Sequence, residues 1–144
     1  MAVLLTYYYP LVMTLIFLAF LFSTNVPARG RFFLRAAVAL VIAVCLAHVN
    51  RVFDLWPAHR LFASGHMTVS FGVALSLGML RPWTVAITLP LLVPFGVALV
   101  ALHFHDVWDV LGAIPLVLVV YGTVHGFWSV PEAAPPLDSA ADSP

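Results

Sequence analysis

The sequence predicts an all-α integral membrane protein, a polytopic helical bundle of about five transmembrane helices. Of its 144 residues, 63% are hydrophobic and 8% are charged, against about 45–50% and about 25% in soluble domains. This composition excludes a soluble globule, and the high hydrophobicity excludes a chain that is disordered throughout. Because one span needs about 20 apolar residues, the chain has room for about five spans and no second domain.

Five apolar segments follow one another along the chain, each close to the length of a membrane-crossing helix. The residues from 129 to 144 are instead rich in Pro, Ala, Ser and acidic side chains, which is typical of a disordered tail. The sequence therefore predicts a single transmembrane catalytic bundle over residues 1–128 and a disordered tail over 129–144. The spans are expected at about 3–22, 32–49, 61–80, 84–102 and 107–128.

The arginines, which are the only basic residues besides histidine, predict the topology. Four of them flank the first and third connections, and the positive-inside rule places these connections in the cytoplasm. The second and fourth connections then share the outer face, although two arginines also lie in the second. With the Arg-, Ala-, Val- and Leu-rich composition, we expect a bacterial inner-membrane protein whose functional face is periplasmic or extracellular. The four cytoplasmic arginines are Arg29, Arg31, Arg35 and Arg81.

Polar side chains gather in the two connections that are expected on the outer face. Ionisable residues at membrane depth are costly, and so they mark a functional site. No basic run is present, which argues against nucleic acid as a partner. The first cluster consists of Asn50, Arg51, Asp54, His59, Arg60, Ser64 and His66, and the second of His103, His105, Asp106 and Asp109.

The tripeptide Ser64-Gly65-His66 opens the third apolar segment. Backbone N–H groups at a helix start attract an anion, and a glycine there lets a phosphate approach the backbone closely. His66 would lie one step further in, where it could donate a proton. The alternative is a helix cap followed by an interfacial histidine.

His105 and Asp109 are four residues apart, so on a helix they would lie on one face. A carboxylate bonded to one ring nitrogen fixes the tautomer and stabilises the positive ring that forms during covalent catalysis. The alternative is a structural His–Asp pair that joins two helices. Zinc binding by the clustered histidines is disfavoured, because His103 and His105 would point to different sides of a helix. We expect no metal and no cofactor.

The two motifs together resemble those of the type 2 phosphatidic acid phosphatase superfamily. In that family a PSGH-type motif starts one span and an H-x-x-x-D-V-x-x-G motif starts the span two later. Residues 63–66 lie at the first motif, and residues 105–110 match the second through its D-V pair, with Gly112 one residue earlier than the motif's glycine. The resemblance covers about residues 45–115 and implies a metal-independent lipid phosphatase or phosphotransferase with a phosphohistidine intermediate. It further implies that His105 is the nucleophile, that His66 protonates the leaving oxygen, and that Asp109 orients His105.

The resemblance is incomplete at the family's phosphate-binding positions. The K-x6-R-P motif cannot be fitted, the Arg six residues before the nucleophilic His is Leu99 here, and the Pro before SGH is Ala63. Positive charge would then come from the two arginines of the second connection, and backbone N–H groups would contribute. The expected substrate-binding residues are Arg51, Arg60, Ser64, Gly65 and His103.

Three functions stay open on the sequence. Residues 103–110 also match the H-x-H-x-x-x-D-V spacing of the sphingomyelin-synthase-like branch, which implies a phospholipid head-group transferase or phosphodiesterase. The first open function is a lipid phosphatase, and the second is this transferase or phosphodiesterase. The third is a non-catalytic lipid-binding or partner protein that kept the scaffold. The expected partners are the membrane and a lipid phosphate or phospholipid substrate, and a homo-oligomer stays open.

Overall fold

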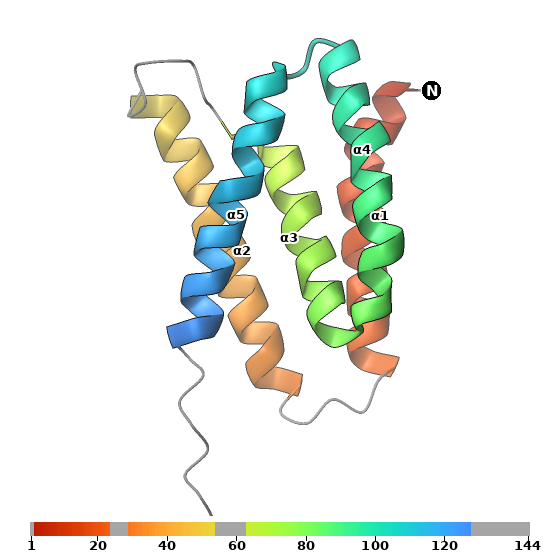
Figure 1. Cartoon of the computed structure of the whole chain (residues 1–144), viewed down its shortest axis with the longest axis vertical. Coiled ribbons are helices and arrows are strands. Elements are labelled where there is room, and N and C mark those ends of the chain that lie inside the picture. Colours follow the sequence, from red (N-terminus) through yellow and green to blue (C-terminus); the bar gives the residue numbers. More distant parts are fainter. Residues whose placement is uncertain (1, 24–28, 54–62, 128–144) are drawn as a thin grey trace, which may run out of the picture.

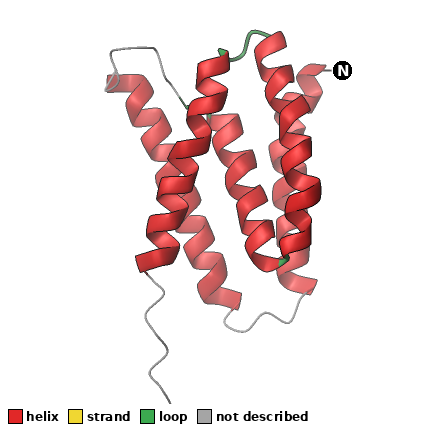
Figure 2. Ribbon diagram, in the orientation of Figure 1, coloured by secondary structure: helices red, strands yellow, loops and turns green. Residues whose placement is uncertain are grey.

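The computed structural model describes residues 2–23, 29–53 and 63–127, and in this part of the chain the fold is all-helical (Figures 1 and 2). The expected all-α membrane bundle is confirmed. Among the described residues, three stretches are long and apolar enough to cross a membrane: Gly30–Asn50, Pro82–Ala101 and Val107–Gly126. The elements are α1 (Ala2–Ser23), α2 (Arg29–Phe53), α3 (Gly65–Leu80), the 3-10 turn η1 (Pro82–Thr84), α4 (Val85–Ala101) and α5 (Val107–Phe127).

The third helix is shorter than the sequence indicates, because it begins at Gly65 rather than near residue 61. Ser64 has extended backbone angles, and its hydroxyl accepts a hydrogen bond from the Met67 N–H group, so the helix is capped there. The 16 residues of α3 rise about 24 Å, less than the about 30 Å of a bilayer's hydrocarbon core. In Figure 1, α3 accordingly begins below the upper ends of α2, α4 and α5.

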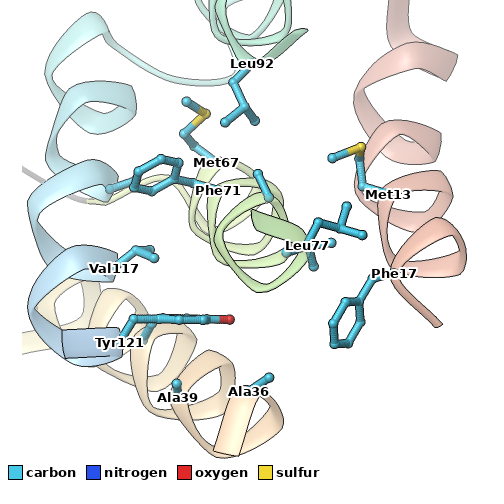
Figure 3. Packing of buried hydrophobic residues seen from close by; sticks show 14 of the residues in the cluster. Met13, Phe17, Ala36, Ala39, Met67, Phe71, Leu77, Leu92, Val117 and Tyr121 are labelled. Atoms are coloured by element: carbon cyan, nitrogen blue, oxygen red, sulfur yellow. The ribbon is translucent and has the colours of Figure 1, made fainter. Parts of the chain in front are cut away.

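α3 is the central helix, since it packs against each of the four others. The core around it combines bulky residues from α1 and α4, such as Phe17 and Phe95, with a stripe of alanines on α2 (Figure 3). Small residues let helix backbones approach closely in a membrane, where water does not drive the helices together. The buried alanines of α2 are Ala36, Ala39, Ala43 and Ala47.

One buried polar contact ties α3 to α5 within this apolar core. The Ser76 hydroxyl donates to the Gly72 carbonyl at 2.9 Å, and the Tyr121 hydroxyl lies 3.1 Å from Ser76 Oγ. Because the serine proton is already used, Tyr121 is the donor of the second bond. A buried polar group left without a partner is costly, so this pair fixes the relative rotation of the two helices.

The helix order brings the two polar connections to one end of the bundle, as the sequence predicts. α2 ends, α3 begins and α4 passes into α5 at the upper end of Figure 1, which we call the site end. α1 ends, α2 begins and α3 passes into α4 at the opposite end. Asp54, His59 and the tail 129–144 lie outside the described residues.

A glycine near the end of α3 allows α4 to start close beside it. A Cβ atom added to Gly78 would lie 2.5 Å from Val85 Cγ2, and the branched valine has little freedom to move away. We expect Gly78→Ala to destabilise the bundle by about 1–3 kcal/mol through overpacking, as measured by unfolding of the detergent-solubilised protein. Gly122→Ala is the control, because nothing lies within 4 Å of its added Cβ. Equal stability of the two variants would contradict this packing.

Candidate functional site

The turn between α4 and α5 is a Schellman motif that carries a histidine in the position usually taken by glycine. The N–H groups of His103 and Phe104 donate to the carbonyls of Val100 and Leu99 at 3.0 and 3.1 Å. His103 therefore adopts a left-handed conformation with φ of 56°, which an L-residue with a Cβ adopts at a cost. The turn reverses the chain within a few residues and presents His105 at the start of α5.

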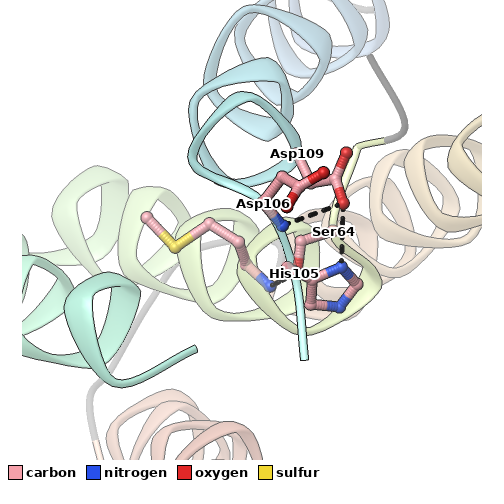
Figure 4. Close-up of polar contacts among 5 residues, drawn as sticks. Ser64, His105, Asp106 and Asp109 are labelled. Atoms are coloured by element: carbon pink, nitrogen blue, oxygen red, sulfur yellow. Dashed lines mark hydrogen bonds and ion pairs between the residues drawn. The ribbon is translucent and has the colours of Figure 1, made fainter. Parts of the chain in front are cut away.

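His105 and Asp109 are in contact, as their spacing predicts, but the geometry is that of a helix cap. His105 lies two residues before α5, whereas Asp109 lies in its first turn. Asp109 Oδ2 accepts from the Asp106 N–H group at 3.3 Å and from His105 Nδ1 at 3.4 Å (Figure 4). The first bond is the returning half of a capping box. The same carboxylate oxygen therefore caps the helix and orients the imidazole ring.

The His105–Asp109 contact is partly shielded from solvent and is loose. The two side chains are 14% and 13% exposed, and 3.4 Å exceeds the about 2.7–2.9 Å of a tight charge-assisted bond. Such contacts often tighten only when substrate is bound. Since a carboxylate only accepts, the ring holds its hydrogen on Nδ1 and leaves Nε2 as the acceptor or nucleophile. Asp109 Oδ1 is buried and has no partner among the described residues.

A backbone hydrogen bond joins the start of α3 to the start of α5. The Ser64 N–H group donates to the Asp109 carbonyl at 2.9 Å. The Ser64 hydroxyl is occupied by the Met67 N–H group, and the residue is fully buried. The N–H group and the hydroxyl oxygen of Ser64 are thus both engaged in hydrogen bonds within the protein. An anion at this helix start would use the N–H groups of the residues that follow it.

The same junction brings the two predicted catalytic histidines together. The ring centroids of His66 and His105 lie 5.9 Å apart in an edge-to-face arrangement. His66 belongs to the first turn of α3 and is partly exposed. A group bound beside both rings could react with one and exchange a proton with the other.

The remaining predicted residues are placed only in part. His103 is exposed and contributes no side chain to the pocket wall described below. Arg51 lies in the last turn of α2, with its side chain outside the described part of the structure. Arg60 lies outside the described residues.

A pocket of about 310 Å³ opens beside His105 and Asp109. α2 forms one wall, and the start of α3 and the α4–α5 turn form the other. Gly65 lines it, and a Cβ added there would meet nothing within 4 Å. His48, on α2, also lines it. No sequence signal marks His48, because it lies within an apolar segment and belongs to no motif.

Neither a cluster of metal ligands among the described residues nor a known relative identifies this site. Within residues 2–23, 29–53 and 63–127, no three His, Cys, Asp or Glu side chains gather as metal ligands. Comparison of the chain with protein-family models, with curated proteins and with solved structures finds no match. The chemistry and geometry of the site itself therefore indicate its function.

Substitutions at His103 can separate the strain of its left-handed backbone from the contacts of its ring. We expect His103→Gly to stabilise the folded protein by about 1 kcal/mol, because glycine adopts this conformation without a Cβ clash. His103→Val should destabilise it, since a branched side chain is strained at positive φ. Thermal unfolding of both variants measures the effect. A stability loss in His103→Gly would show that the ring makes contacts that outweigh the strain.

Proposed function

We propose that this protein is a membrane enzyme that breaks a phosphoester bond of a lipid through a phosphohistidine intermediate. A single observation carries the proposal: His105, held by Asp109 at Nδ1, lines a pocket at the end of an apolar bundle, and the ring of His66, which does not itself line the pocket, lies next to the His105 ring. A nucleophile, a group that orients it and a proton donor are the three parts that such chemistry needs. The motif resemblance to the type 2 phosphatidic acid phosphatases supports the same roles.

In the first step, Nε2 of His105 attacks the phosphorus atom and the bond from phosphorus to the lipid oxygen breaks. His66 gives its proton to that oxygen, so the lipid leaves as an alcohol. Asp109 accepts a hydrogen bond from the Nδ1–H group throughout and stabilises the positive charge that the ring gains. Its loose 3.4 Å contact would tighten as that charge develops.

In the second step, water attacks the phosphohistidine and the bond from phosphorus to nitrogen breaks. His66, now neutral, takes the proton from the water, which restores both histidines and releases inorganic phosphate. A lipid hydroxyl in place of water would instead complete a head-group transfer, as in the sphingomyelin-synthase-like branch. The chemistry of the first step is shared, and only the acceptor differs.

The charge of the phosphoryl group needs donors that stabilise it in the transition state. We assign this role to Arg51 and Arg60, whose planar guanidinium groups match phosphate oxygens in pairs, and to the N–H groups at the start of α3. The positive end of the α3 dipole adds to them. Gly65 keeps this helix start open to the pocket.

We further propose that the site end faces the periplasm or the exterior of a bacterial inner membrane. Support comes from the arginines at the opposite end, because the cytoplasmic side of a membrane protein carries the excess of positive charge. The lipid would then come from the outer leaflet.

Turnover by the purified protein tests the proposal directly. We expect wild-type protein in detergent to convert members of a panel of lipid phosphates and phosphodiesters, and His105→Ala to convert none. Asp109→Asn should lower kcat by about 10²–10⁴-fold, because the ring loses its orientation and its charge partner. Phosphorus NMR identifies the products: free phosphate indicates a phosphatase, and a new phospholipid or an alcohol-linked phosphate indicates the alternative transferase or phosphodiesterase.

His125→Gln is the matched control, because His125 lies near the other end of α5 and has no role in the proposed reaction. It should keep wild-type turnover, with folding of all variants checked by gel filtration. No turnover on any lipid by folded wild-type protein would refute catalysis and favour a lipid-binding or partner role.

Gly65→Ala should affect phosphate binding in the pocket without affecting the stability of the fold. The added methyl group would meet no protein atom within 4 Å, so the unfolding temperature should stay the same or rise slightly, as alanine favours helix. The methyl group would enter the space where the phosphate must approach the backbone, and we expect kcat/KM to fall by about tenfold or more, a cost of about 1.4 kcal/mol. Unchanged kcat/KM would exclude phosphate binding at this helix start.

A further inference from the structure

A long apolar groove lies between α4 and α5, with α3 as its floor. Its volume is about 620 Å³, within the range of about 300–1,000 Å³ that is usual for ligand sites. Met67 and Phe71 of α3 are almost fully buried at the floor. Val93 and Val97 of α4 form the rim and are 66% and 63% exposed. The groove thus opens on the outer surface of the bundle, where a membrane would surround it.

The groove runs along the helices from the site end toward the middle of the membrane. Its residues on α4 extend from Leu89 to Ala101, which is about 18 Å along a helix axis. That length is close to half of the about 30 Å hydrocarbon core, the share of one lipid leaflet. All of the residues that line it are apolar.

The groove and the polar pocket are neighbours along two chain segments. Gly65 lines the pocket and Met67 lines the groove, with His66 between them. On α5, Asp109 lines the pocket and the next residue, Val110, lines the groove. The groove and the pocket have no lining residue in common but meet at the same starts of α3 and α5, so a tail in the groove would place a polar head near His105.

We infer that the groove between α4 and α5 holds an acyl chain of the lipid whose head group reaches the polar pocket. The inference deepens the proposed function and rests on it only for the position of the head. It assigns the position of the lipid's chain, which descends along α4 through one leaflet. It also assigns the route, because a chain in this groove enters sideways from the surrounding leaflet.

The rim favours an acyl chain over a helix from a second copy. Helix–helix contacts in membranes use small residues at the surface, so that two backbones approach closely. Here Val93, Val97 and Leu111 project around the opening, and the glycine of the groove, Gly96, is buried. A Cβ added to Gly96 would lie 3.1 Å from Val110 Cγ1, so this glycine serves the packing of α4 on α5 rather than an outside helix.

Photolabelling tests the groove without depending on catalysis. The probe is a phosphatidic acid with a diazirine midway along one acyl chain, present in phosphatidylcholine vesicles that hold the full-length His105→Ala protein. After irradiation, mass spectrometry locates the labelled residues. We expect residues 67–71 and 89–101 to be labelled several-fold more than the lipid-facing residues Leu118 and Val119 of α5, which are 50% and 67% exposed.

Filling the groove gives the matched comparison. Val97→Trp in the same background should reduce labelling of residues 67–71 several-fold, whereas Val119→Trp, of similar exposure but outside the groove, should not. In protein with His105 intact, Val97→Trp should raise KM several-fold with little change in kcat. A raised KM of this kind reports lost binding rather than lost chemistry.

The outcomes separate this inference from the proposed function. Groove labelling without turnover on any lipid would refute the enzyme and leave the groove as a lipid-binding site. Turnover with labelling spread evenly over the lipid-facing helices, or labelling that Val97→Trp leaves unchanged, would overturn the groove. Photoproducts or cross-links that join two protein chains through residues 89–101 would show that a second copy covers it, which would also overturn it.

Discussion

The hydrogen bond from the Ser64 N–H group to the Asp109 carbonyl is the contact on which the candidate site depends. It joins the starts of α3 and α5, two helices that are separated in the chain by the whole of α4. Such a hydrogen bond is stronger inside an apolar bundle, because no water molecules compete for its donor and acceptor. Through it, the helix start that carries His66 and the helix start that carries Asp109 are held in register.

The arrangement of spans could be predicted from the sequence because a bilayer leaves the chain few alternatives. A backbone in hydrocarbon must satisfy its own hydrogen bonds, so each apolar segment becomes a helix, and consecutive helices must alternate in direction. The positions of the polar clusters along the chain therefore determine that they share one end. The contact between His105 and Asp109 was predictable from spacing, although it arises from capping of α5 and not from a shared helix face.

Other features of the site could not be predicted, for physical reasons. The turn at His103 lacks the glycine that normally marks a left-handed position, so only the structure reveals it. Hydropathy alone carries the third apolar segment back to about residue 61, and the true start of α3 agrees instead with the helix cap that the sequence offers at Ser64. His48 reaches the pocket through the packing of α2 against the bundle, and no local pattern encodes such a tertiary placement.

The short central helix has a consequence for the membrane itself. α3, at 16 residues, rises about 24 Å, several ångströms less than an average hydrocarbon core, and bilayers adapt to such a mismatch at a fraction of a kcal/mol per Å. Because longer helices surround α3, the residues at its start lie deeper in the membrane than the upper ends of α2, α4 and α5 (Figure 1). Bilayer thickness thus affects the site without any change of residue, since the head groups of a shorter-chain bilayer lie closer to the level of Gly65. The acyl-chain length of the host lipids would then set how far a head group lies from the start of α3.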